Sequence, residues 1–76
     1  MPKPRVSMSH IYADVALDFN EAGNMRPSHC DVRCAVNDYL DTLARDGFKV
    51  NFGYSQDRAF RSVRKILLRA KGPERM

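Results

Sequence analysis

Apolar and polar residues alternate over positions 10–20 of the chain. The odd positions are all apolar and the even ones mostly polar: Ile11, Ala13, Val15, Leu17 and Phe19 against His10, Tyr12, Asp14, Ala16, Asp18 and Asn20. Alternation with a period of two is typical of a strand that buries one face. A helix is the competing interpretation, but it would place Asp14 and Asp18 beside Ile11 and Val15. The pattern therefore predicts a strand over 10–20.

A helical period follows a loop at 21–27, which contains glycine and proline. Ser28 is a typical N-cap residue, and Asp31 stands three positions later, close to the spacing of a capping box. Gly47 stands where a helix often ends on a residue with positive φ. Between them, apolar residues at helical spacing predict a helix that buries Val32, Val36, Tyr39, Leu40 and Leu43.

The second half of the chain repeats this order. Alternation over 48–54 predicts a short second strand, with Phe48, Val50, Phe52 and Tyr54 on one face. Ser55 is expected to cap a second helix, and Asp57 in its first turn suits the positive helix N-terminus. Gly72-Pro73 is expected to end this helix, whose predicted buried residues are Phe60, Val63, Leu67 and Ala70.

These elements predict an α+β fold of β-α-β-α order, in which two helices cover one face of a short sheet. The single domain is expected over 10–72, between a flexible lead-in at 1–9 and a tail at 73–76. Two strands make a marginal sheet in water, and a chain of 76 residues buries little surface alone. We therefore expect a homodimer that pairs strand edges or the outer faces of the first helix.

Positive charge is concentrated in the second predicted helix and the residues after it. Residues 55–76 hold seven basic and two acidic residues, a net charge of +5, whereas residues 1–54 hold six basic and seven acidic residues, a net charge of −1. On a helical wheel, Arg58, Arg61, Lys65 and Arg69 lie away from the apolar residues, with Arg64 and Lys71 at the border. Neighbouring like charges on a helix repel by a few tenths of a kcal/mol, so this arrangement indicates an acidic partner.

Phosphate groups of nucleic acid are the partner that fits these cations best. Two alternatives are a solvated face and an anionic membrane, but the apolar face is needed by the fold and lacks tryptophan, which disfavours a membrane. The outer face of the first helix is acidic and forms a candidate protein interface, made of Asp31, Cys34, Asp38 and Asp41. It could instead pair with the basic residues across a dimer and neutralise them.

The cysteines and histidines indicate no metal site, cofactor or catalytic centre. Cys30 and Cys34 are four residues apart, which is not the spacing of a structural zinc site, and we expect them to be partly covered by a loop or an interface. The chain contains no known catalytic motif, so no enzyme activity is expected. It also lacks an apolar run of transmembrane length and a signal-peptide pattern, so a cytoplasmic location with reduced thiols is expected.

The sequence thus predicts a non-catalytic binding module. The leading hypothesis is that it engages nucleic acid or a nucleoprotein complex, mainly through phosphates and without reading bases. The alternative is a protein-docking regulator or inhibitor, such as a phage-encoded effector that blocks a host enzyme or defence complex.

Overall fold

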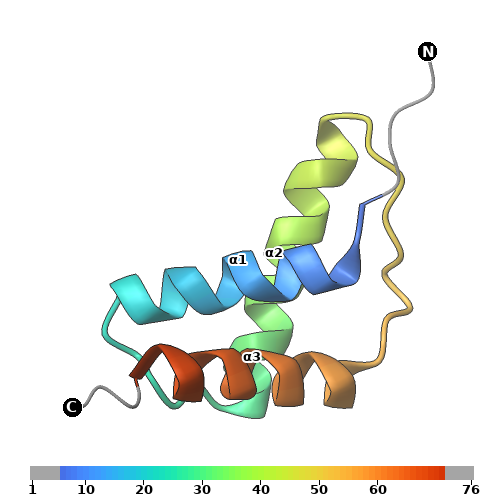
Figure 1. The fold of residues 1–76 in the computed structure, drawn as a ribbon. Helices are drawn as coiled ribbons and strands as arrows, with labels where there is room; N and C mark the ends of the chain where they lie inside the picture. Colours follow the sequence, from blue (N-terminus) through green and yellow to red (C-terminus); the bar gives the residue numbers. More distant parts are fainter. Residues whose placement is uncertain (1–5, 72–76) are drawn as a thin grey trace.

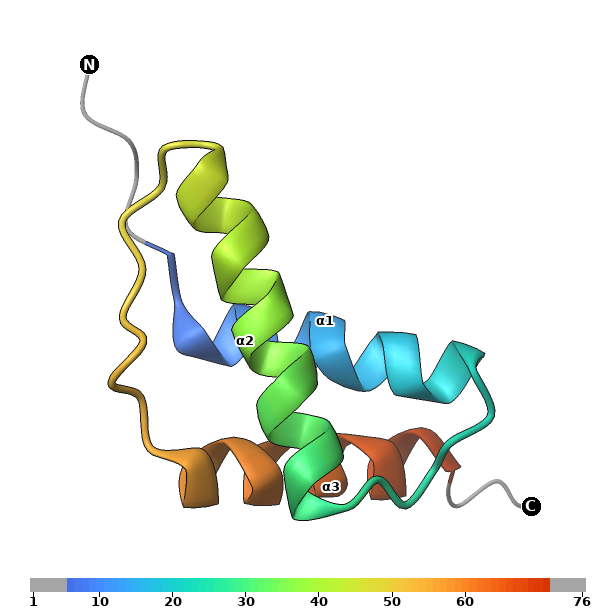
Figure 2. The same cartoon turned by 180° about the vertical axis from the view of Figure 1, so that it is seen from behind.

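The computed structural model describes residues 6–71, except for the side chain of Lys71. Within these residues the chain forms three helices and no strand: α1 (Met8–Glu21), α2 (His29–Arg45) and α3 (Gln56–Lys71). The α+β class and the β-α-β-α order predicted from the sequence are therefore wrong, and the domain is all-helical. Helices α1 and α3 lie side by side and run in the same direction, and α2 crosses both on one side (Figures 1 and 2).

Residues 10–20, which the sequence predicts as a strand, belong to α1. The apparent alternation arises because the apolar face of this helix is broad, and Leu17 on its other side is 53% exposed. Asp14 does lie beside apolar positions on this helix, but its carboxylate accepts a hydrogen bond from the hydroxyl of Tyr39 on α2. This hydrogen bond offsets the cost of placing a carboxylate beside apolar residues, which was the argument for a strand. The buried residues are spaced as a helix requires: Ile11, Tyr12, Val15 and Ala16.

Residues 48–54, predicted as the second strand, are part of the connection between α2 and α3. Since α1 is helical, no strand edge is present for this segment to pair with. It is fixed instead by Tyr54, which is buried and whose hydroxyl donates a hydrogen bond to Oδ1 of Asn37 on α2 at 2.9 Å. Phe52 is 54% exposed, so the predicted buried face of a strand does not form.

Helix α2 has the ends that the sequence predicts. The backbone N–H of Asp31 donates to Oγ of Ser28 at 3.0 Å, and the N–H of Ser28 donates to Oδ2 of Asp31 at 3.2 Å, which completes a capping box. At the other end Gly47 has a φ of 94°, and the N–H of Phe48 donates to the carbonyl of Leu43 at 3.0 Å. This is the bond of a Schellman motif, so both predicted ends are confirmed.

The core lies where the three helices meet, and each pair of helices is in contact. It takes Ile11, Tyr12, Val15 and Ala16 from α1, Val32, Val36 and Leu40 from α2, Ala59, Val63 and Leu67 from α3, and Tyr54 from the connection. Because α1 begins at Met8, the end of the 1–9 segment is helical. Residues 1–5, the tail at 73–76 and the predicted helix stop at Gly72-Pro73 lie outside the described residues.

Candidate nucleic-acid interface

Helix α3 carries the positive charge, and its first turn is capped as predicted. The backbone N–H of Arg58 donates a hydrogen bond to Oγ of Ser55 at 3.2 Å, and Asp57 lies in the first turn. The helix buries Ala59, Val63 and Leu67. Ala70, which the sequence predicts as buried, is exposed. The half of the helix opposite the core is therefore open to solvent.

Four exposed cations on this open half form what we call the basic face: Arg58, Arg61, Lys65 and Arg69. Arg58 and Arg69 are eleven positions apart, which at the rise of an α-helix is about 16 Å. None of the four is needed for the core, so their arrangement is free to serve a partner. Lys71, predicted at the border of this face, ends α3, and its side chain is not among those described.

The basic face is less uniform than the sequence suggests, because one of its cations is paired. Nη2 of Arg61 lies 2.7 Å from Oδ2 of Asp57, one turn earlier on the same helix. An acid therefore lies beside this face. Exposed pairs four residues apart contribute only about 0.3–0.5 kcal/mol to stability. The guanidinium can therefore exchange this carboxylate for a phosphate at little cost.

Arg64 is directed toward α2 and stands apart from the basic face. Its guanidinium carbon lies 5.3 Å from the centre of the Phe60 ring, and it is only half-exposed. The same ring stacks on His29 at the start of α2, with ring centres 4.9 Å apart. A cation over an aromatic face stabilises packing, which gives this arginine a structural role.

A groove of about 210 Å³ runs between α1 and α3 beside the basic face. It is lined by two cations of that face, two hydroxyl side chains, one core residue and one partly buried residue: Lys65 and Arg69, Ser9 and Ser62, Tyr12, and Ile66. Burial raises the pKa of the Tyr12 hydroxyl, and the nearby positive charge of Arg58 opposes this rise. The sequence did not reveal the contribution of α1, because a strand at 10–20 would have placed these residues elsewhere.

Two acidic residues of α1, Asp14 and Asp18, lie toward α2 rather than toward this groove. Asp14 accepts the hydrogen bond from Tyr39, and the pKa of Tyr39 is raised to about 12, first by that bond and then by burial. The negative charges of Asp14 and Asp18 contribute to the same rise, so both carboxylates lie near Tyr39. The carboxylates of Asp14 and Asp18 are thereby directed away from the cations of α3.

Within one chain, the acidic outer face of α2 makes no ion pair with the basic face among the described side chains. Asp31 is engaged in the capping box, Asp38 is exposed, and Asp41 pairs with Arg45 of the same helix at 3.0 Å. Within residues 6–71, each ion pair joins two side chains of one helix. Intramolecular pairing between the acidic and basic faces is thus absent from the described part of the chain.

Cys30 and Cys34 lie on the same outer face of α2 as free, exposed thiols. The expectation that a loop covers them is wrong. The charge and hydrogen bonding of the adjacent Cys30 thiol raise the pKa of Cys34 above its ordinary value. Nη2 of Arg33 lies 3.7 Å from Sγ of Cys30. In the described residues, no group of three or more histidine, cysteine or acidic side chains is arranged to hold a metal ion.

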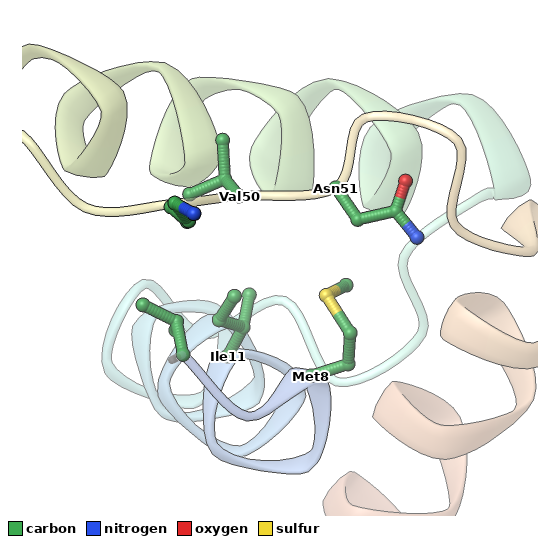
Figure 3. Close-up of a pocket in the computed structure, with 6 residues that line it drawn as sticks. Met8, Ile11, Val50 and Asn51 are labelled. Carbon is green, nitrogen blue, oxygen red and sulfur yellow. The ribbon is translucent and has the colours of Figure 1, made fainter. Parts of the chain in front are cut away.

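A second hollow, of about 360 Å³, lies between the start of α1 and the connection that follows α2. Met8 and Ile11 of α1 lie across it from Val50 and Asn51 (Figure 3). Lys49 is the charged residue in its lining, which includes no member of the basic face. This hollow is therefore separate from the candidate interface.

No protein-family model, curated protein or solved structure matches this chain. Among α1, α2 and α3 as far as they are described, none combines the length and the hydropathy that crossing a membrane requires. The function is therefore inferred from the residues and their geometry.

Proposed function

We propose that this protein is a small non-catalytic binding module that contacts the phosphate backbone of nucleic acid, either free or in a nucleoprotein complex. The observation that carries the proposal is the basic face, with four exposed cations on one helix. Guanidinium and ammonium groups form charge-assisted hydrogen bonds with phosphate oxygens. On duplex DNA the phosphates of one strand follow at about 3.4 Å along the axis, so a face of about 16 Å lies alongside several of them.

The distribution of acids supports this proposal. Asp14 and Asp18 lie near Tyr39 on the α2 side of α1, and among the side chains that the structure describes the acids of α2 make no ion pair with α3. An approaching polyanion therefore meets cations and hydroxyl groups first, which increases the rate of encounter. Gln56 is the one side-chain amide in α3, at its first residue, so the proposed contacts are mainly to phosphates and position the partner rather than select a base sequence.

The test is reversal of charge on the basic face. Arg61→Glu, Lys65→Glu and Arg69→Glu together should abolish binding to a labelled 24-base-pair duplex in fluorescence anisotropy at low salt. If all four cations of the basic face contact phosphates, the wild-type slope of log K against log salt is about −3.6, and the triple variant should lose about 2.7 of it. Surface changes of this kind alter stability by about 0.5 kcal/mol per site, and circular dichroism would verify the fold.

A matched control separates the basic face from net charge. Arg33, Arg45 and Lys49 are exposed cations on α2 and the following connection, so their reversal to glutamate changes the total charge equally. This control should retain most of the affinity. Equal loss in both triple variants, or a wild type that binds no duplex or single strand at low salt, would contradict the proposal.

The second candidate is a protein-docking regulator or inhibitor, and one observation favours it. Leu68 is 66% exposed on α3 and lines a hollow with Arg64 and Met25, so an apolar anchor lies beside positive charge. An acidic protein with an apolar side chain would fit this combination. Leu68→Ser should then abolish a protein complex, whereas phosphate binding should be unchanged because leucine contributes no charge-assisted bond.

We also propose a cytoplasmic location. Cys30 and Cys34 are free and exposed, which suits a reducing compartment, and nucleic acid is accessible there. Fractionation of cells that express a tagged chain, with trapping of free thiols, tests this. Recovery from an oxidising compartment would contradict it.

A further inference from the structure

The phenylalanine and tyrosine rings of the described residues are placed where a partner of the basic face cannot stack on them. Tyr12 and Tyr54 are buried, and a further four are partly buried: Phe19, Tyr39, Phe48 and Phe60. The ring on α3 itself, that of Phe60, stacks with His29 and has the Arg64 guanidinium beside it. Among the phenylalanine and tyrosine rings Phe52 is the exposed one, and it belongs to the connection before α3 rather than to the basic face.

Proteins that bind single strands combine a positive groove with several aromatic rings on which successive bases stack. The surface along α1 and α3 offers the positive charge without these rings. The basic face supplies cations, and the groove between the helices adds the hydroxyl groups of Ser9 and Ser62 to Lys65 and Arg69. These groups recognise phosphate oxygens, and they gain nothing from an exposed base.

The fixed spacing of the cations also favours a duplex over a single strand. Arg58, Lys65 and Arg69 project from a single α-helix, which holds them at fixed spacing. A duplex carries its phosphates at regular spacing on a stiff rod, so several contacts form together without ordering the partner. A single strand must be ordered to make the same contacts, and this cost is not offset here by stacking.

We propose that the partner of this surface is double-stranded nucleic acid, bound by the phosphates of its backbone, with the groove between α1 and α3 as part of the contact. This inference rests on the proposed function and narrows it to one class of ligand. Duplex DNA and duplex RNA share the required chemistry, and the arms of the experiment distinguish them.

The experiment measures the affinity of the full chain for a labelled 24-nucleotide single strand and for the matching duplex, each as DNA and as RNA. We expect the better duplex to bind about tenfold or more tightly than either single strand. Stacking contributes about 1–3 kcal/mol per base to single-strand binding, and without it the cost of ordering the single strand is not offset. With the same four contacts, the salt slope should be about −3.6 on duplex DNA and about −2.8 on single strands.

Two variants make the result specific. Ser9→Glu places a carboxylate in the groove and should reduce duplex affinity, whereas Phe52→Ala should leave every affinity unchanged, with circular dichroism as the control for folding. Single-strand binding that equals duplex binding and falls in Phe52→Ala would overturn the inference but leave the proposed function intact. Binding to neither form would overturn the proposed function itself.

Discussion

The hydrogen bond between Tyr39 and Asp14 allows a quantitative test of the α1–α2 packing. It joins residues 25 positions apart, and both side chains are partly buried. If residues 10–20 formed a strand, nothing would require this contact. Tyr39→Phe removes the hydroxyl while it keeps the ring, and Asp14→Asn removes the charge while it keeps an acceptor of the same shape.

The expected magnitude follows from the type of bond and its exposure. A buried hydrogen bond to a charged group contributes about 1.5–3 kcal/mol to the free energy of unfolding. Both partners here are half-exposed, so solvent reduces this to about 1–2 kcal/mol. For a domain of this size, 1 kcal/mol corresponds to about 4–8 °C in Tm, so Tyr39→Phe should melt about 5–15 °C below the wild type.

The assay is urea unfolding followed by far-ultraviolet circular dichroism, with both single variants and the double variant as a thermodynamic cycle. We expect a coupling energy of about 1 kcal/mol between the two sites. Tyr54→Phe is a matched control, because its hydroxyl donates to the neutral amide of Asn37, and its loss should not couple to Asp14→Asn. A coupling energy within the measurement error of about 0.3 kcal/mol would refute this account of how α1 is held.

Four further predictions concern single features of the molecule. Folding raises the pKa of Tyr39 from 10.0 to about 12. The hydroxyl should therefore contribute its full stability below pH 10 and lose it as the pH rises through 12. The urea midpoints of the wild type and Tyr39→Phe should converge in that range. Cys30 and Cys34 should react with Ellman-type reagents in the native state, and protection of both thiols until denaturant is added would contradict their exposure. Cys30→Ser should speed the reaction of Cys34, because it lowers the pKa of the Cys34 thiol. Asp57→Asn should tighten nucleic-acid binding slightly, because it removes the carboxylate that competes with phosphate for Arg61, but lower helix stability by about 0.3–1 kcal/mol. Weaker binding of this variant would contradict the competition. Light scattering should detect a homodimer at micromolar concentration through the outer face of α2, and a constant mass near 8.7 kDa would exclude it.

Local signals in the sequence predicted α2 and α3 well, because their ends depend on near neighbours. Ser28 and Asp31 form their capping box within four residues, Gly47 ends α2 with positive φ, and Ser55 caps α3. Each of these signals depends on chemistry that is complete within one helical turn. The open half of α3 followed from the same periodicity, so the four cations of the basic face were found from sequence.

The assignment of α1 failed because it depends on a residue far along the chain. Alternation at 10–20 treats Tyr12 and Ala16 as outward-facing, although both are buried in the helix. The argument against a helix was that Asp14 and Asp18 would lie beside apolar residues. The sequence does not show that Asp14 finds a hydrogen-bond partner in Tyr39, because the two residues are 25 positions apart. A helical spacing was nevertheless present in Ile11, Tyr12, Val15 and Ala16. The pairing of Asp57 with Arg61 was visible too, as an acid four residues before a base.

The correction of α1 changes the functional picture as well as the fold. With a strand at 10–20, the binding surface would be one helix with a row of cations. As a helix, α1 lies along α3 and adds Ser9 to a groove that contains Lys65 and Arg69. Asp14 lies toward α2 because it bonds to Tyr39, so the hydrogen bond that fixes α1 also keeps this negative charge away from the groove. Weakening that bond should therefore affect binding through the position of α1, whereas reversing cations on α3 should affect binding with the fold intact.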